Sequence, residues 1–177
     1  MIPFPNKKYN IIYADPPWSY KNKNTGGSMK SGSSAKYETM TTEDICNLPI
    51  ESIRARDSVL FLWATVPLIE DAFQVMKSWG YKYKTMITWH KIMSLGMGYW
   101  FRGQCEHLLL GVRGSVKSFR LQEPNFMQLK ALKHSEKPEE FRYLIDRATE
   151  NMPEQKKIEL FARKKVMGWD CWGDEID

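Results

Sequence analysis

The sequence has few cysteines, and they are far apart. There are three cysteines, Cys46, Cys105 and Cys171, and no two of them form a C-x-x-C pair. An odd count without paired spacing indicates neither a disulfide framework nor a zinc site. We therefore expect a reducing compartment and no bound metal.

Long apolar segments and nucleotide-binding glycine motifs are absent too. No apolar run approaches the length that crosses a bilayer, and the stretch MIPFPNKKYN lacks the apolar core of a signal peptide. These features predict a soluble, cytoplasmic protein. Because no G-x-G-x-x-G occurs, composition and spacing alone indicate no nucleotide cofactor.

The 177 residues do contain many basic and aromatic side chains. There are 26 Lys and Arg against 21 Asp and Glu, which gives a net charge of +5, and aromatic residues make up 13%. A chain of this length favours a single domain over residues 1–177. Basic and aromatic surface is what unstacked nucleobases prefer, although the rings also serve as ordinary core.

Strand and helix signals alternate along the chain. We expect strands at 9–14, 57–65, 81–91, 106–114 and 156–164, and helices at 41–49, 67–80 and 135–150. The doubly apolar stretch 57–65 is typical of a central strand in a parallel sheet. The alternation predicts an α/β fold with helices on both faces of the sheet. A polar segment rich in Lys, Asn, Gly and Ser predicts a mobile substrate loop at about 19–40.

The stretch YNIIYADPPWSY is the most informative in the chain. Asp15 directly follows a buried strand, and in an open α/β sheet ligands bind at the carboxyl ends of strands. Pro16 and Pro17 lack amide protons, so we expect the carbonyls of this turn to be free and Trp18 to offer a flat face. Such acceptors beside an aromatic ring suit the amino group of cytosine or adenine. The competing interpretation is an ordinary strand-ending turn.

The DPPW segment after NIIYA resembles the catalytic motif of amino-methyltransferases that use S-adenosylmethionine. Its Asp and Trp are similar to the adenine-N6 branch, the MT-A70-like family of the catalytic subunit of the eukaryotic mRNA adenosine methyltransferase and its bacterial and phage relatives. Further segments resemble the family in the same order: AKYETMT, VLFLWAT, GYWFRGQCEHLLLGVRG, SEKP and KKIELFAR. The resemblance implies a Rossmann-like methyltransferase fold in permuted order, with the catalytic motif before the cofactor-binding strand.

The resemblance also implies roles for individual residues. In the catalytic motif, the Asp15 carboxylate and the Pro16 carbonyl would hold adenine N6, and Trp18 would stack on the base or wall its pocket. The implied catalytic set is Asp15, Pro16, Pro17 and Trp18, the substrate set is Tyr37, Glu106, Lys137, Lys21 and Lys23, and the S-adenosylmethionine set is Asp15, Lys137, Arg163, Lys165, Asp174 and Glu175.

Plain structural interpretations stand beside several of these roles. Glu106 also fits a salt-bridged strand end, Lys137 an ordinary helix entry before Pro138, and Arg163 a solvated strand end. Lys165 and Val166 depart from the family, whose members often carry His and Asn there.

The function expected from the resemblance is transfer of a methyl group from S-adenosylmethionine to adenine N6 in DNA, by direct in-line attack. The alternatives are an RNA adenosine methyltransferase and a catalytically silent nucleic-acid-binding subunit of a heterodimer. A cytosine-N4 enzyme is disfavoured because Ser commonly replaces the Asp in that group. A monomer or homodimer is expected, with a heterodimer as the alternative, and the segment GYWFRG fits a partner interface, a base-stacking surface or core.

Overall fold

The computed structural model describes residues 2–20, 39–96, 98, 100–132, 136–174 and 176. The elements in chain order are β1 (Tyr9–Ala14), α1 (Thr42–Cys46), η2 (Ile50–Ser52), β2 (Arg54–Thr65), η3 (Val66–Leu68), α2 (Ile69–Ser78), β3 (Lys82–Ile92), β4 (Cys105–Arg113), β5 (Phe126–Lys130), α3 (Glu139–Thr149), β6 (Lys157–Leu160) and β7 (Asp170–Trp172). In the described ranges, no helix has the length and apolar character needed to cross a membrane.

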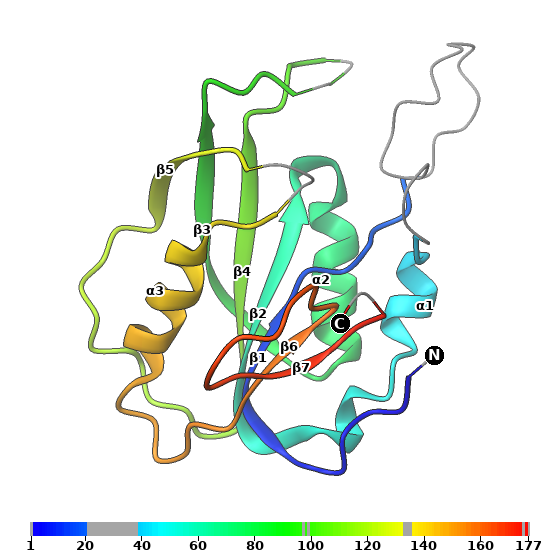
Figure 1. Cartoon of the computed structure of the whole chain (residues 1–177), viewed down its shortest axis with the longest axis vertical. Helices are drawn as coiled ribbons and strands as arrows, with labels where there is room; N and C mark the ends of the chain where they lie inside the picture. Colours follow the sequence, from blue (N-terminus) through cyan, green and yellow to red (C-terminus); the bar gives the residue numbers. More distant parts are fainter. Residues whose placement is uncertain are drawn as a thin grey trace.

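The strands form one seven-stranded sheet in the order β5-β3-β4-β2-β1-β6-β7 (Figure 1). β1 lies between β2 and β6 and is parallel to both, although β6 comes late in the chain. The prediction of a parallel sheet around 57–65 is wrong on one side, because β4 runs antiparallel to both β2 and β3. A run that is apolar on both faces indicates that both faces of the strand are buried. It does not indicate whether the neighbouring strand is parallel or antiparallel.

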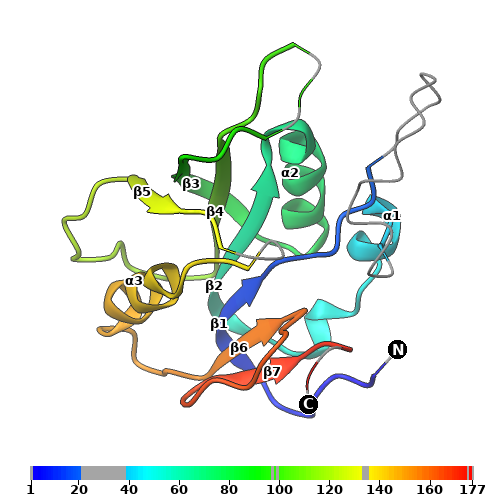
Figure 2. The ribbon, with the colours of Figure 1, turned by 45° about the horizontal axis from the view of Figure 1, so that its top comes forward.

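Helices cover both faces of the sheet, as the alternating pattern predicts (Figure 2). One face of the sheet packs with α1 and α2, where Ile12 and Leu62 share a core cluster with Val75. The other packs with α3, where Ile11 and Trp63 meet Phe141. The α/β class with two helical layers is therefore confirmed.

The local signals at α1 and α3 are also confirmed. The Thr41 hydroxyl accepts from the Asp44 amide, and the Asp44 carboxylate accepts from the Thr41 amide, which is a capping box at the start of α1. Pro138 is the residue from which α3 begins, so Lys137 stands at a helix entry. The short strands β5 and β7 were not expected from the sequence.

Strand register places several strand ends on one edge of the sheet. Ala14, the last residue of β1, pairs with Leu62 of β2 and with Leu160 of β6. Because β4 is antiparallel, its second residue, Glu106, lies at this same edge, opposite Thr65 of β2 and Trp89 of β3. We call this side of the sheet the carboxyl edge. The residues that follow β1 and β6 and those that begin β4 therefore meet there.

Candidate active site

The DPPW turn is held to the loop before α1 by backbone hydrogen bonds. The Trp18 amide donates to the Pro16 carbonyl at 2.8 Å, and the Met40 amide donates to the Pro17 carbonyl at 2.8 Å. The expectation that the carbonyls of this turn stay free is therefore wrong. The prolines remove donors from the turn, but neighbouring amides still use its acceptors.

Trp18 is a wall of the turn rather than an exposed plate. Its side chain is buried, with only 7% exposed, and its indole N–H donates to the Trp63 carbonyl at 3.1 Å. The expectation that Trp18 offers a flat face for stacking is corrected accordingly. A buried indole needs a partner for its N–H, and this bond ties the turn to β2.

Asp15 belongs to a chain of four alternating charges at the carboxyl edge. Lys137 Nζ lies 2.7 Å from Asp15 Oδ2 and 3.3 Å from Glu106 Oε2. The other Glu106 oxygen pairs with Lys91 at the end of β3. The structure thus brings together three residues that the sequence assigned to the site from positions 15, 106 and 137.

This charge cluster is largely removed from water. The side chains of Lys137, Glu106 and Asp15 are 11%, 9% and 22% exposed. Lys137 Nζ also lies 5.3 Å from the centroid of the Trp63 ring, whose own N–H donates to the Tyr13 hydroxyl at 2.7 Å. Buried charges persist only when they are paired and hydrogen bonded, so each of these ions depends on its neighbours.

The charge pairing decides the ionisation of the cluster. Burial alone would raise the pKa of Glu106, but the nearby Lys137 and Lys91 ammonium groups hold it below its ordinary value. Burial alone would lower the pKa of Lys137, but Asp15 and Glu106 hold it above its ordinary value. Both residues therefore stay charged at neutral pH.

A pH dependence of stability follows from Glu106. A lowered pKa means that its contribution to stability is complete above its ordinary pKa of 4.5 and is lost as the pH falls through the lower folded value. We expect the difference in unfolding free energy between the wild type and Glu106→Gln to stay constant from about pH 9 to pH 6 and to shrink below about pH 4.5. Urea titrations across this range measure it. A raised pKa would instead make the difference grow as the pH falls from 8 to 6, and such growth would contradict the pairing.

The remaining described candidates lie along the same edge, beyond the ends of β6 and β7. Arg163, Lys165 and Asp174 are exposed there, one and two strands away from β1. The chain turns sharply after β6, because Phe161 has a φ of +61°. A Cβ on Gly173 would lie 2.5 Å from the Ala162 carbonyl oxygen, so the two strand ends approach closely only with glycine at 173.

Four predicted site residues lie outside the described residues, namely Tyr37, Lys21, Lys23 and Glu175. The greater part of the substrate loop expected at about 19–40 lies outside them as well. Their roles stay predictions.

Lys91 and Tyr20 join the site although the sequence did not single them out. Lys91 pairs with Glu106, and its ammonium lies 4.9 Å from the Trp89 ring. Alternation in TWHK puts Lys91 on the face of Trp89, but only the β3–β4 register brings it to Glu106. The Tyr20 hydroxyl lies 2.9 Å from Thr65 Oγ1; burial and the charges of Glu106 and Asp15 raise its pKa.

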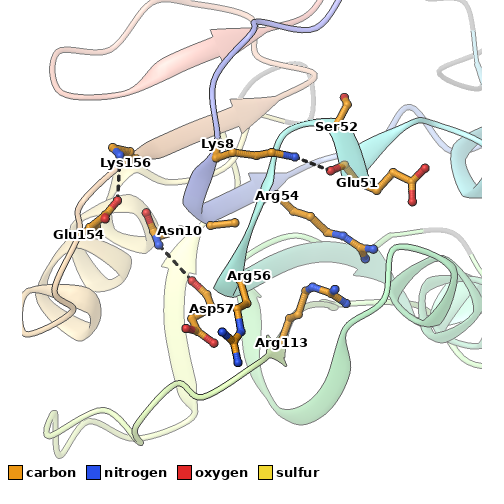
Figure 3. A pocket seen from close by; sticks show the side chains of 11 residues that line it. Lys8, Asn10, Glu51, Ser52, Arg54, Arg56, Asp57, Arg113, Glu154 and Lys156 are labelled. Atoms are coloured by element: carbon orange, nitrogen blue, oxygen red, sulfur yellow. Dashed lines mark hydrogen bonds and ion pairs between the residues drawn. The ribbon is translucent and has the colours of Figure 1, made fainter.

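A pocket of about 880 Å³ opens on the side of the sheet opposite the carboxyl edge, where β1, β2 and β6 begin (Figure 3). Five basic side chains line it: Lys8, Arg54, Arg56, Arg113 and Lys156. Arg54 donates to the Trp79 carbonyl, and Arg113 donates to the Gly80 carbonyl at 3.4 Å. These two cations therefore complete the C-terminal end of α2. The pocket is remote from Asp15, and we do not assign the active site to it.

Comparison with known proteins agrees with the geometry. The MT-A70 family model matches residues 9–175. "Type II methyltransferase M.MunI" of Mycoplasma sp. is 36% identical over 189 residues, which cover 97% of this chain and 79% of that protein. "N(6)-adenosine-methyltransferase MT-A70-like" of Arabidopsis thaliana is 27% identical over 96% of this chain and 24% of its own length. "N(6)-adenosine-methyltransferase catalytic subunit METTL3" of Homo sapiens is 28% identical over 96% of this chain and 28% of its own.

The chain thus spans about a quarter of the plant and human relatives, and most of the Mycoplasma one. Its order of elements, with the DPPW turn after β1 and the neighbouring β6 late in the sequence, agrees with the permuted Rossmann-like fold that the resemblance implied. The chain belongs to the MT-A70 family, whose members are S-adenosylmethionine-dependent adenine-N6 methyltransferases.

Proposed function

We propose that this chain transfers a methyl group from S-adenosylmethionine to the N6 atom of adenine in DNA, with Asp15 as the acceptor that holds the amino group. The observation that carries the proposal is the ion cluster at the carboxyl edge. Lys137 occupies only one oxygen of Asp15, Oδ2, at 2.7 Å. Among the described residues, Oδ1 makes no hydrogen bond, and the Asp15 side chain is more exposed than those of Lys137 and Glu106.

An amino group is the ligand that such a site accepts best. A carboxylate only accepts hydrogen bonds, and the N6 group of adenine presents two donors in the plane of the ring. Asp15 Oδ1 would take one proton. The Pro16 carbonyl has a second lone pair beyond its bond to the Trp18 amide and would take the other. Both acceptors follow β1 directly, so the strand fixes their spacing.

These residues favour the reaction by polarising and aligning N6. The lone pair of N6 is delocalised into the ring, and hydrogen bonds from both amino protons shift electron density back onto nitrogen. When bound, S-adenosylmethionine supplies a methyl group activated by its sulfonium. Alignment to about 3–3.5 Å then suffices for direct transfer. As the new bond forms, N6 loses one proton, and Asp15 is its nearest acceptor.

Lys137 and Glu106 hold Asp15 in place. The Lys137 ammonium has three donors, and its bonds to Asp15 and Glu106 leave the orientation of both carboxylates fixed. Lys91 neutralises the second oxygen of Glu106, which prevents two bare carboxylates from facing each other. We assign Lys137, Glu106 and Lys91 as positioning residues.

The residues beyond β6 and β7 suit S-adenosylmethionine by their chemistry. The cofactor carries ribose hydroxyls and an amino group, which are donors, and a carboxylate, which is an acceptor. Asp174 would accept from the ribose, and Arg163 and Lys165 would bind the carboxylate. Gly173 approaches the backbone of Ala162 closely, and no side chain of residue 173 lies between the two segments. The proposed cofactor site therefore borders Asp15, since β6 pairs with β1.

DNA is the proposed polymer because the bacterial relative, which this chain matches over most of its length, is a type II methyltransferase. In duplex DNA the target base must leave the stack, which costs a few kcal/mol, or the enzyme must act on single strands.

A methyl-transfer assay with labelled S-adenosylmethionine on matched single-stranded DNA, duplex DNA and RNA tests the choice of polymer. We expect label in DNA and at least tenfold less in RNA. Preferential labelling of RNA would replace the DNA assignment with the RNA alternative. No transfer to any polymer, despite measurable nucleic-acid binding, would favour the silent binding subunit.

A further inference from the structure

The connection between β3 and β4 extends the hairpin beyond the carboxyl edge (Figure 1). The Lys91 amide donates to the Gln104 carbonyl at 2.8 Å, and further out the Gly96 amide donates to the Gly103 carbonyl at 2.8 Å. We call the described residues of this connection, 93–96, 98 and 100–104, the β3–β4 tip. It starts two residues after Lys91 and ends two residues before Glu106, so both ends of the tip adjoin the ion cluster.

Close backbone contacts fix the shape of this tip. A Cβ on Gly98 would lie 2.0 Å from the Phe101 carbonyl oxygen, and one on Gly96 would lie 2.5 Å from the Gly103 carbonyl oxygen. Only glycine permits both approaches, so the two arms lie tightly together. The Arg102 guanidinium also donates from Nε to the Gly96 carbonyl at 2.8 Å.

Two large aromatic side chains project from the tip into solvent. Trp100 is 94% and Phe101 is 91% exposed. Soluble proteins rarely present adjacent aromatic rings in this way without a binding role. The segment from 93 to 104 carries one arginine and no Asp or Glu, so no carboxylate repels a polyanion there.

The tip lies within reach of nucleotides that flank a base bound at Asp15. Trp100 is six residues from Glu106, which spans at most about 20 Å in an extended strand. Successive nucleotides in a duplex strand advance by about 3.4 Å, so this reach corresponds to about six nucleotides. Aromatic rings bind bases of any sequence through their faces, and each stacked base raises affinity by about fivefold to a hundredfold.

We propose that Trp100 and Phe101 form a stacking platform for nucleobases within about six nucleotides of the target adenine. This proposal rests on the proposed function, because it takes nucleic acid as the substrate. The platform holds the flanking strand while the target base is out of its stack. It also gives stacking a place that the buried Trp18 does not supply.

The test uses 2-aminopurine, a fluorescent base that stacking quenches, placed in turn at each of six positions on either side of the target adenine. With the wild type we expect quenching at one or two of these positions. The double variant Trp100→Ala and Phe101→Ala should lose the quenching and raise the Kd for DNA by about tenfold or more. Its Tm and its affinity for S-adenosylmethionine should not change, because both rings are exposed.

Two variants serve as controls. Met93→Ala removes an equally exposed but non-aromatic side chain of the same tip and should leave quenching and Kd unchanged. Phe101→Tyr keeps a ring and should retain the quenching. Equal quenching, Kd and turnover for the wild type and the double variant would overturn the platform while the methyltransferase assignment stands. Failure of the wild type to bind or methylate any nucleic acid would instead overturn the proposed function.

The double variant also separates this proposal from a protein interface. Sedimentation velocity should give the same oligomeric state for the wild type and the double variant. A wild-type dimer that becomes monomeric in the variant, with no position-specific quenching in the wild type, would overturn the platform and assign the tip to contact between copies of the chain.

Discussion

Replacing Asp15 with Asn should lower the rate of methyl transfer by about a hundredfold to a thousandfold. This is the effect of removing one preorganised electrostatic contact from an active site. Asn has the size of Asp but carries no charge, and its amide nitrogen would present a donor to a site that requires acceptors. Folding should be retained, because Lys137 keeps its pair with Glu106. Single-turnover methylation measures the rate, and calorimetry should give a Kd for S-adenosylmethionine within a few-fold of the wild type.

The matched control is Glu70→Gln, an equally neutralising change on the exposed side of α2. It should leave the rate unchanged. An Asp15→Asn protein that methylates at the wild-type rate would show that another group holds the amino nitrogen. Loss of cofactor binding together with the rate would mean that Asp15 acts mainly on the cofactor.

Replacing Lys137 with Met should lower both stability and activity. The methionine fills a similar volume but leaves Asp15 without its ion pair and leaves Glu106 with Lys91 alone. Removing one partner of a buried pair costs about 3–5 kcal/mol, and we expect about 3 kcal/mol because Lys91 remains and Asp15 is partly exposed. Urea unfolding measures the loss. Methyl transfer should fall at least tenfold, and Lys137→Arg should restore part of both.

Lys164→Met offers a control with the same chemistry at the surface. Lys164 bridges Glu136 and Glu139 at 3.1 and 2.7 Å, and all three side chains are about half exposed. Exposed pairs contribute at most about 1 kcal/mol. Equal destabilisation by Lys137→Met and Lys164→Met would show that the ion pairs at the carboxyl edge stabilise the fold no more than exposed ion pairs do.

The sequence predicts local structure well because local signals carry it. The apolar run at 9–14, the capping residues at 41–44 and the proline at 138 each specify an element through neighbours in the chain. The direction of β4 depends on the pairing of distant strands, which no local pattern encodes. β5 and β7 are short and are the outermost strands of the sheet. Every second residue of β5 is exposed, and β7 has only three residues, so neither has a strong apolar pattern in the sequence.

The site was predictable where residue type and position coincide. Asp15 follows a buried strand, and that pattern alone indicates a ligand-binding edge. The partners of Glu106 were not predictable, because Lys91 reaches it through antiparallel register and Lys137 through the placement of α3. The side chain of Trp18 was assigned to a ligand because it follows the proline turn at the end of a buried strand, whereas its burial depends on β2 and the strand-like bridge to Met40.

The most direct test is the identity of the methylated atom. DNA methylated by the wild type should be digested to nucleosides and analysed by mass spectrometry against N6-methyldeoxyadenosine and N4-methyldeoxycytidine standards. We expect N6-methyldeoxyadenosine from the wild type and at least a hundredfold less of it from Asp15→Asn. N4-methyldeoxycytidine, or a methylated adenine ring nitrogen, would contradict the assignment of Asp15 and Pro16 to the amino group of adenine.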